Sequence, residues 1–263
     1  MNILEKIINH KQKELAERKS MYPVALLEKS IYFETPCLSM KSYLQRQDKS
    51  GIIAEFKRKS PSKGEINMHA NIEEVSIGYM MAGASGLSVL TDTHFFGGKN
   101  EDLTQARDFN YCPILRKDFI VDEYQIIEAK SIGADAILLI AECLSIQEVQ
   151  QLAGFARSLN LEVLLEMHSE KQLQKICPPV TMVGINNRDL ETFQTNIETS
   201  LRLADQIPPD FVKVSESGIS QASTIQSLKN AGYEGFLIGG YFMEDDEPHK
   251  RAERLVKALK TLV

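Results

Sequence analysis

Short apolar runs alternate with longer amphipathic stretches throughout the chain after residue 50. The runs are rich in Ile, Leu and Val and lack the strict polar alternation of a half-exposed strand, so we interpret them as parallel strands covered on both faces. The eight predicted strands are residues 51–56, 86–91, 113–117, 134–140, 161–166, 181–185, 211–215 and 235–239.

The stretches between these runs have the spacing of helices that bury one face. They are residues 71–82, 101–109, 123–131, 146–159, 170–176, 197–206, 222–231 and 248–262. Asp122 and Ser145 stand at N-cap positions, and Ser145 with Glu148 matches a capping box. Gly83 and Gly133 stand where a helix must end before the next strand. The repeated strand–helix units predict a closed (β/α)8 barrel, an α/β fold, rather than an open sheet.

The first 50 residues lie outside this repeat. Helical spacing marks five apolar positions near the start, and residues 23–27 and 40–44 are predicted to be further helical pieces. The five positions are Ile3, Leu4, Ile7, Ile8 and Leu15. About 50 residues bury too little surface to fold alone. We therefore expect residues 1–263 to form a single domain, with residues 1–50 as a helical extension packed on the barrel.

Composition and charge narrow the class of protein. The chain has 263 residues, of which 43% are hydrophobic and 25% charged, and this profile excludes a disordered chain, a fibrous repeat and a membrane span. Lys and Arg total 30 against 36 Asp and Glu, so the net charge is −6. Such a chain has no general field that attracts nucleic acid or an anionic membrane. We therefore expect neither partner, and local positive groups must hold any anionic ligand.

The cysteines and the N-terminal sequence indicate the cellular compartment in which we expect the protein. The 4 cysteines contain no C-x-x-C pair, and the first residues show no export signal. We therefore expect reduced thiols in a cytoplasmic protein.

In a barrel of this kind, the chemistry lies at the carboxyl ends of the strands. Glu55 and Lys57 are two residues apart at the end of the first predicted strand, so they point to one face and help each other to stay ionised. Lys117 shares the parity of Leu115, which predicts an inward ammonium that donates a proton, helped by a depressed pKa. Two alternatives stay open: a solvated cationic cluster at residues 57–59, and an outward Lys117 paired with an acid.

The fifth and sixth predicted strands end in further polar groups. Glu166 is in phase with Leu164 and is a candidate acid or base, and His168 has the same parity, so a Glu–His metal pair is an alternative. No other His lies at a strand end with the spacing of a metal ligand, so we predict no metal. Asn186 and Arg188 either bind hydroxyls or a carboxylate, or stabilise a turn.

The last two predicted strands end in small residues. Loops after the seventh and eighth strands of such barrels often form a phosphate site from backbone N–H groups. Ser217 and Gly218 follow the seventh strand, and Gly239 and Gly240 end the eighth. Because glycine lets the backbone approach an anion, these positions predict a phosphorylated ligand, with ordinary turns as the alternative.

Five segments carry a resemblance to a known family. They are residues 53–62, 113–120, 165–168, 184–190 and 215–219, and the first two, IAEFKRKSPS and PILRKDFI, are highly specific in combination. Through them the chain resembles the indole-3-glycerol phosphate synthases of tryptophan biosynthesis. The resemblance covers essentially the whole chain, including the N-terminal extension.

The resemblance implies a (β/α)8 carboxy-lyase that closes the indole ring without a cofactor. Its substrate would be 1-(2-carboxyphenylamino)-1-deoxyribulose 5-phosphate, and its products indole-3-glycerol phosphate, CO₂ and water. Lys117 is implied to be the general acid that protonates the ketose oxygen. Lys57 would hold the carboxylate of the substrate, and Glu55 would orient Lys57. Glu166 would transfer protons in the dehydration, with Lys57 as its partner.

The same resemblance implies the residues that bind the rest of the substrate. Asn186, Arg188 and Glu216 would position it. The residues implied to surround the phosphate are Ser60, Ser217, Gly218, Gly239 and Gly240. The expected partner is this phosphorylated small molecule, and the expected state is a monomer or a weak homo-oligomer; contacts with other tryptophan-pathway enzymes are left open.

One position departs from the family pattern. A small hydroxyl or acidic residue often follows the glycine of the last strand, whereas this chain has Gly240 and then Tyr241. Backbone donors survive this change, but a side-chain contact to the phosphate is in doubt. Tyr241 is expected to crowd the rim or to cover the ligand.

Two other functions were weighed. A phosphoribosylanthranilate isomerase is a similar barrel, but its chemistry calls for a Cys–Asp pair at strand ends, where this chain places no cysteine. A non-catalytic scaffold barrel is expected to lose the Lys and Glu residues that this chain has.

Overall fold

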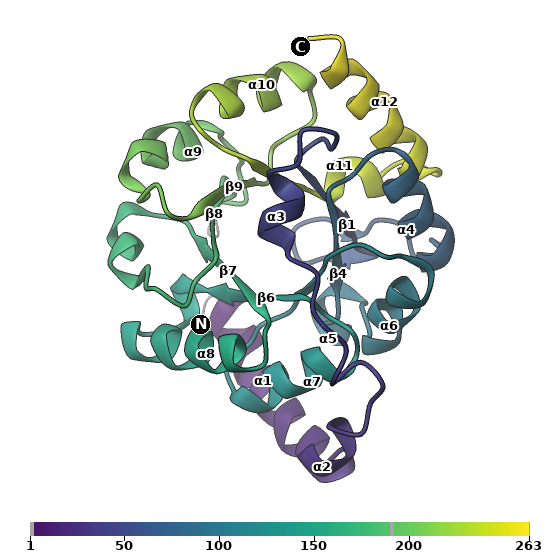
Figure 1. The fold of residues 1–263 in the computed structure, drawn as a ribbon, viewed down its shortest axis with the longest axis vertical. Coiled ribbons are helices and arrows are strands. Elements are labelled where there is room, and N and C mark those ends of the chain that lie inside the picture. The colour runs from purple at the N-terminus through teal and green to yellow at the C-terminus, as the bar shows by residue number, and fades with distance from the viewer. Residues whose placement is uncertain (1–2, 190–191, 263) are drawn as a thin grey trace.

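The computed structural model describes residues 3–189 and 192–262. In this part of the chain, parallel strands close into a barrel in which the strands follow one another in chain order and the last pairs with the first (Figure 1). The barrel strands are β1 (Ile52–Phe56), β4 (Gly86–Leu90), β5 (Ile114–Lys117), β6 (Ala136–Ile140), β7 (Glu162–Met167), β8 (Met182–Asn186), β9 (Val212–Glu216) and β10 (Gly235–Ile238). The predicted (β/α)8 barrel is confirmed.

Both faces of the barrel strands are buried, which explains the missing polar alternation of the runs. Side chains of one parity, such as Ile53 and Leu115, fill the interior of the barrel. Side chains of the other parity, such as Ile52 and Ile137, pack against the surrounding helices. Strand parity therefore decides which residues reach the open end of the barrel.

Helices cover the outside of the barrel (Figure 1). They include α4 (Ile72–Met81), α6 (Asn100–Phe109), α7 (Glu123–Ser131), α8 (Ile146–Ser158), α9 (Glu198–Leu203), α10 (Ala222–Asn230) and α12 (Pro248–Lys260). The Asp122 side chain accepts a hydrogen bond from the N–H of Tyr124 at the start of α7. Ser145 and Glu148 form the capping box of α8. Both predicted caps are confirmed.

Two predicted helices differ from the observed elements. Residues 170–176 were expected to be α-helical but form the 3-10 helix η2 (Glu170–Lys175), and residues 197–206 contain α9 followed by the 3-10 helix η3 (Ala204–Gln206). Proline pairs follow both segments, at 178–179 and at 208–209. Proline disfavours helical backbone at the residue before it and cannot donate a backbone hydrogen bond, so these segments end as short, tight turns.

The N-terminal extension covers both ends of the barrel. It contains α1 (Ile3–Met21), α2 (Val24–Leu27) and α3 (Met40–Leu44), and α3 lies in front of the barrel opening in Figure 1. Met40 and Leu44 fill the space beside Gly86 and Gly235, the first residues of β4 and β10, so α3 closes the amino end. Ile7 of α1 belongs to the core inside the barrel and lies at the opposite, carboxyl end.

Several short elements at the carboxyl end were not predicted. They are the hairpin of β2 (Lys59–Ser60) and β3 (Gly64–Glu65), and the short helices α5 (Thr93–Phe96), η1 (Ala141–Cys143) and α11 (Gly240–Met243). Each follows a barrel strand directly or by a few residues, so together they form the rim of the open end.

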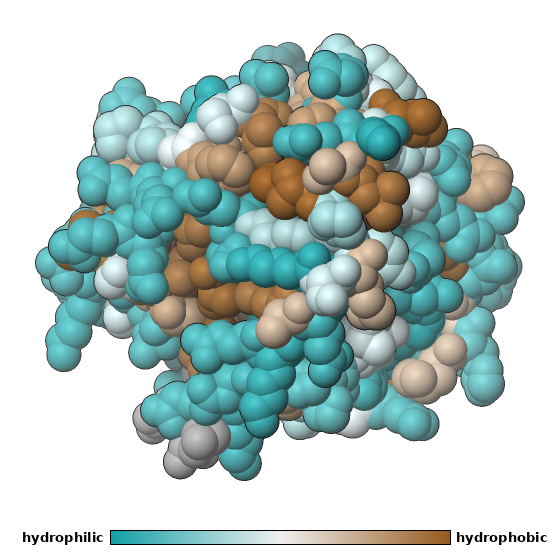
Figure 2. Space-filling model, turned by 90° about the horizontal axis from the view of Figure 1, so that it is seen from below, coloured by the Kyte–Doolittle hydropathy of each residue, from teal (hydrophilic) through white to brown (hydrophobic). Residues whose placement is uncertain are grey.

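The surface seen in Figure 2, from the side of α2, is mainly hydrophilic, with several separate apolar patches. In the described residues, no helix combines the length and the apolar character needed to cross a membrane. All 4 cysteines are free thiols, and two of them, Cys112 and Cys177, are buried.

Candidate active site

A cavity of about 620 Å³ opens at the carboxyl ends of the barrel strands. All the predicted site residues line it, although they come from six strands and the loops that follow them. They are Glu55, Lys57, Ser60, Lys117, Glu166, Asn186, Arg188, Glu216, Ser217, Gly218, Gly239 and Gly240. The structure therefore places all of these residues at one cavity, while their roles remain predictions.

Glu55 and Lys57 form the first ion pair of the cavity. The Nζ of Lys57 lies 2.6 Å from Oε1 of Glu55, and the Glu55 side chain is buried. A side chain at Gly239 would occupy the place of the Glu55 carboxylate, so this glycine makes room for the acid as well as lining the cavity. The alternative of a solvated cluster holds only in part: Lys59 is bound outside the cavity to the carbonyl of His94 at 2.6 Å.

Lys117 lies between two carboxylates. Its Nζ is 2.8 Å from Oε2 of Glu166 and 2.7 Å from Oε2 of Glu216. Leu115, two residues earlier, belongs to the core inside the barrel. The predicted inward orientation of Lys117 is confirmed, and the outward alternative is wrong. Pairing with Glu216 was not predicted; the shared parity of Glu216, Val214 and Val212 was the available signal.

Lys117, Glu166 and Glu216 form a triad, and the pKa of its lysine differs from the sequence-based expectation. Burial alone would lower the pKa of Lys117, but Glu166, Glu216 and Glu55 raise it above its ordinary value. The expected depressed pKa of Lys117 is therefore wrong for the free protein, because its carboxylate neighbours outweigh its desolvation. Lys117 is fully protonated at neutral pH.

The two carboxyl groups of the triad differ in protonation: Glu166 is ionised and Glu216 is protonated. Burial would raise the pKa of Glu166, but Lys117 and His168 lower it to about 2. Burial raises the pKa of Glu216 to about 8; Lys117 opposes this rise, and Glu166 and Glu55 add to it. At neutral pH one buried ammonium therefore faces one carboxylate and one carboxylic acid. The Oε1 atom of Glu216 has no hydrogen-bond partner among the described residues; it is buried and lies against Gly184.

Two neighbouring asparagines lie at the carboxyl end of β8, Asn186 as its last residue and Asn187 directly after it, and they make different contacts. The Nδ2 of Asn186 donates to Oε1 of Glu166 at 3.1 Å in the cavity. Asn187 is buried and braces the turn, since its Nδ2 donates to Oγ of Ser215 at 3.0 Å. Arg188 lines the cavity and donates to the carbonyl of Phe193 at 2.9 Å. The Oδ1 of Asn186 also accepts the N–H of Arg188 at 3.0 Å, so the turn-stabilising alternative holds for Asn186 as well as Asn187. Ligand binding by Asn186 and Arg188 stays a prediction, and Leu190 of the same segment lies outside the described residues.

His168 adds a basic group next to Glu166. Its Nε2 lies 3.5 Å from Oε1 of Glu166, and neither ring nitrogen has a hydrogen-bond partner in the described part of the chain. In the described residues, no group of three His, Cys, Asp or Glu side chains is placed to hold a metal ion. The Glu166–His168 pair alone offers too few ligands for a stable site.

Small residues and two cations form one end of the cavity. Ser217 and Gly218 have positive φ values of 67° and 74°, so the chain turns sharply after β9. The side chains of Lys63, Arg251 and Glu244 also line this end and were not predicted; Glu244 pairs with Lys63 and lies 3.8 Å from Arg251. Arg251 lies over the ring of Tyr241, with its guanidinium carbon 4.0 Å from the ring centroid. Tyr241 therefore stands at the rim, as expected, and supports a cation there.

Apolar side chains form the other wall, which the sequence analysis did not identify. Phe96 and Phe119 lie with their ring centroids 5.9 Å apart, and both line the cavity. Leu138, Ile140 and residues of α1 complete this wall. Phe119 shares the parity of Lys117, and this was the signal that could have placed it. A flat aromatic group fits between such walls.

A closed (β/α)8 barrel with an acid–base cluster at the carboxyl ends of its strands is typical of a TIM-barrel enzyme. Comparison with known proteins narrows this class to one family. The indole-3-glycerol phosphate synthase family matches residues 4–255, and the chain belongs to this family. It is thereby a tryptophan-biosynthesis enzyme.

Curated relatives agree with this assignment over almost their full length. The chain is 48% identical over 259 residues to an indole-3-glycerol phosphate synthase of Bacteroides thetaiotaomicron, covering 98% of this chain and 99% of that protein. It is 39% identical over 261 residues to the protein of the same name from Burkholderia ambifaria, covering 97% of this chain and 98% of that protein.

Solved structures of distant sequence share the fold alone. The 3-hexulose-6-phosphate synthase of Salmonella typhimurium has a TM-score of 0.62 at 10% identity and covers 80% of this chain and 98% of its own. A chain of the tryptophan synthase α2β2 complex of Pyrococcus furiosus has a TM-score of 0.58 at 14% identity and covers 82% of this chain and 100% of its own.

Proposed function

We propose that this chain is a carboxy-lyase that converts 1-(2-carboxyphenylamino)-1-deoxyribulose 5-phosphate into indole-3-glycerol phosphate, CO₂ and water. The observation that carries the proposal is the Lys117 ammonium, held between Glu166 and Glu216 in a cavity with one apolar wall and one cationic, small-residue end. Ring closure needs a proton donor, dehydration needs an acid and a base, and this triad offers both.

The two ends of the cavity orient the substrate. The phosphate fits the end formed by Ser60, Ser217, Gly218, Gly239 and Gly240, with Lys63 and Arg251 close by. The aromatic ring fits between the apolar walls, and its carboxylate meets the ammonium of Lys57. Glu55 fixes that ammonium through the 2.6 Å ion pair. The ketose carbon then lies next to Lys117, with Asn186, Arg188 and Glu216 holding the hydroxyl-bearing chain.

The first step forms the new carbon–carbon bond. The ring carbon that carries the carboxylate attacks the ketose carbonyl carbon, and the carbonyl oxygen takes a proton from Lys117. The bond to the carboxylate then breaks, CO₂ leaves, and the released electron pair restores the aromatic ring. This electron sink lies in the substrate itself, so the proposal includes neither a cofactor nor a metal.

The second step removes water. The new hydroxyl leaves with a proton from an ammonium, Lys57 in this proposal, while Glu166 removes a proton from the neighbouring carbon. Lys117 prepares Glu166 for this role, because its ammonium, together with His168, lowers the pKa of Glu166 against the effect of burial. Once Lys117 has given its proton away, burial prevails and Glu166 becomes a stronger base.

The remaining expectations belong to the same proposal. We infer a cytoplasmic enzyme that acts as a monomer or weak homo-oligomer and contacts no nucleic acid or membrane, in line with its net charge of −6. Residues 1–50 act as part of a single domain, since Ile7 of α1 and Met40 of α3 are buried with the core inside the barrel.

Fluorescence of the indole product tests the proposal. The wild-type protein is mixed with the synthetic ketose phosphate, and indole fluorescence and released CO₂ are measured together. We expect equal amounts of both, at a rate that chelators leave unchanged. A folded protein that releases no indole product contradicts the proposal, and inhibition by a chelator that added metal reverses would assign a metal to Glu166 and His168.

A further inference from the structure

A buried lysine of the N-terminal helix contacts the loops that carry the cavity walls. Lys11 of α1 is 2% exposed, and lysine is almost never buried so completely unless it is paired. Its Nζ lies 2.9 Å from Glu14, 3.0 Å from Asp92 and 3.1 Å from Asp118. Three carboxylate oxygens thus lie within ion-pair distance of one ammonium, which donates a hydrogen bond to Glu14. Burial would lower the pKa of Lys11, but Asp118, Asp92 and Glu14 raise it above its ordinary value.

The first of the two buried partners, Asp92, holds one cavity wall. Its Oδ1 accepts hydrogen bonds from the N–H groups of Phe95 at 2.7 Å and Phe96 at 3.2 Å, and these bonds start the short helix α5. Its Oδ2 faces Lys11, which is its cationic partner within the described residues. Because Asp92 is fully buried, the position of Phe96 depends on a carboxylate that Lys11 neutralises.

The second buried partner, Asp118, directly follows Lys117. Its Oδ1 accepts the N–H of Phe119 at 2.8 Å and also faces Lys11, while its Oδ2 accepts the hydroxyl of Thr91 at 2.6 Å. The N–H of Thr91 in turn donates to the carbonyl of Lys117 at 3.2 Å. Burial would raise the pKa of Asp118, but Lys11 and Arg116 lower it to about 2, so it is an anion at every working pH. This carboxylate therefore fixes the backbone that directly follows the Lys117 side chain, from its carbonyl to Phe119.

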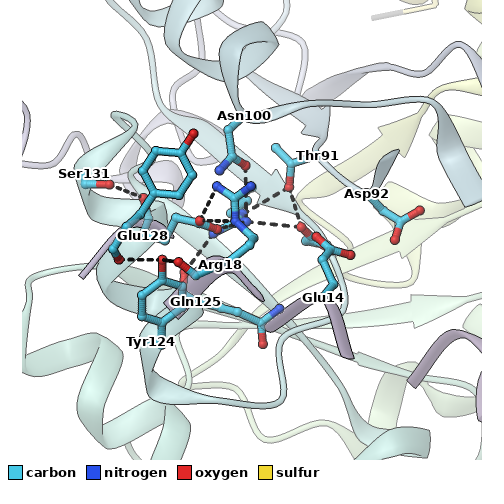
Figure 3. Close-up of polar contacts among 12 residues, drawn as sticks. Glu14, Arg18, Thr91, Asp92, Asn100, Tyr124, Gln125, Glu128 and Ser131 are labelled. Carbon is cyan, nitrogen blue, oxygen red and sulfur yellow. Dashed lines mark hydrogen bonds and ion pairs between the residues drawn. The ribbon is translucent and has the colours of Figure 1, made fainter. Parts of the chain in front are cut away.

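A second cation, Arg18, binds the same helix to the barrel farther from the cavity. Arg18 lies 2.5 Å from Oε1 of Glu128 (Figure 3). The Oε2 of Glu128 binds Arg116 at 2.5 Å. Lys11 and Arg18 are seven residues apart and so lie on one face of α1. Arg18 reaches α7 on the outside of the barrel, whereas Lys11 reaches the strand ends next to Phe96, Lys117 and Phe119.

We propose that Lys11 is a positioning residue for the reaction. Through Asp92 and Asp118, its ammonium fixes the position of the aromatic wall of the cavity relative to the proton donor Lys117. The proposal rests on the proposed function. Without the ammonium, two buried carboxylates close to each other lose their shared cation, and the loops after β4 and β5 relax apart. Misplacement of a catalytic group by about 1 Å is enough to cost about 100-fold in rate.

Turnover of the Lys11→Met variant tests this inference, with Arg18→Met as the matched control. Both changes remove one cation of α1 that faces a buried carboxylate, but only Lys11 touches the carboxylates next to the cavity. For Lys11→Met we expect kcat per folded molecule to fall 10- to 100-fold, with a smaller change in KM. For Arg18→Met we expect kcat within about twofold of wild type, because Glu128 keeps Arg116.

Two further variants keep the test decisive. Lys11→Met combined with Asp92→Asn removes both charges while an Asn oxygen still caps α5, and we expect it to recover part of the lost kcat. If Lys11→Met does not fold, Lys11→Arg replaces it; the planar guanidinium keeps the charge but not the contacts to three carboxylates, and we expect at least a fivefold loss of kcat. An equal loss of kcat in Arg18→Met, or turnover of the Lys11 variants within twofold of wild type, overturns the inference. An inactive wild type overturns the proposed function instead.

Discussion

Both ends of the barrel bury carboxylates next to cations, but they use these charges differently. At the amino end, Asp135 accepts hydrogen bonds from the N–H groups of Leu38 at 2.7 Å and Ile114 at 2.8 Å, and it pairs with Arg107. Both of its oxygens are satisfied. At the carboxyl end, Oε1 of Glu216 has no hydrogen-bond partner among the described residues.

The two ends also differ in the kind of donor that each buried carboxylate faces. At the amino end, Glu162 accepts hydrogen bonds from neutral donors of the extension, the hydroxyl of Ser39 at 2.6 Å and the N–H of Lys41 at 2.9 Å. At the carboxyl end, Glu55, Glu166 and Glu216 share two ammonium groups in one cavity. Burial raises the pKa of Asp135 as well, so a shifted pKa alone does not separate the two ends. Satisfied buried charges fix the chain, while crowded and partly unsatisfied charges at an open cavity are available for chemistry.

The largest expected effect follows from removing the shared ammonium. Lys117→Met deletes the proton donor, and we expect kcat to fall at least about a thousandfold while the circular dichroism spectrum stays unchanged. Lys213→Met is the matched control, because Lys213 lies on β9, the strand of Glu216, but binds the carbonyl of Ala204 outside the barrel. Near-normal turnover by Lys117→Met would show that Lys117 is not the acid. The charges at the carboxyl end would then not differ in role from those at the amino end.

A smaller effect is expected from the other ammonium of the cavity. Lys57→Met leaves the substrate carboxylate without its cation, so we expect KM to rise and kcat to fall, with kcat/KM lower by about 100-fold. Steady-state kinetics with the synthetic substrate measure both constants. If neither constant changes, Lys57 does not hold the carboxylate.

The amino end should respond in stability and not in turnover. Asp135→Asn leaves the half-buried Arg107 without its carboxylate, and we expect the free energy of unfolding to fall by about 2 kcal/mol. Turnover per folded molecule should stay within about twofold of wild type, because Asp135 lies at the far end of the strands. Urea unfolding and kinetics on the same sample separate the two quantities, and a large loss of turnover contradicts the division between the ends.

The smallest expected effect is a pH dependence of stability. The pKa of Glu216 is raised to about 8, so between pH 5 and pH 8 the folded state keeps a proton that the unfolded state has released. The free energy of unfolding therefore falls as pH rises through this window. In Glu216→Gln this slope should be reduced, and urea unfolding at several pH values measures it; equal slopes in both proteins would show that Glu216 is ionised.

Strand parity made much of the site predictable. Charged residues that interrupt an apolar run are costly to bury, so Glu55, Lys57, Lys117 and Glu166 stood out in the sequence. Because parallel strands end at one rim, their grouping followed from the barrel. The resemblance to the family then supplied the reaction, which no residue pattern alone contains.

The parts that were missed depend on contacts between distant segments. The pKa of Lys117 was expected to be depressed because burial was considered without Glu216, which lies 99 positions farther along the chain. The pairing of Lys11 with Asp92 and Asp118 likewise joins α1 to two strand ends. Short rim elements such as α5 and the β2–β3 hairpin have too few residues to show a periodic pattern.

The most direct test of the central claim is a crystal structure of the Lys117→Met variant with the unreacted substrate bound. Our account predicts the phosphate next to Gly218 and Gly240, the carboxylate within ion-pair distance of Lys57, and the ketose oxygen facing position 117. A substrate bound in the reverse direction, with its phosphate at Lys57 or its ketose oxygen away from position 117, would contradict the assignment of Lys117 as the proton donor.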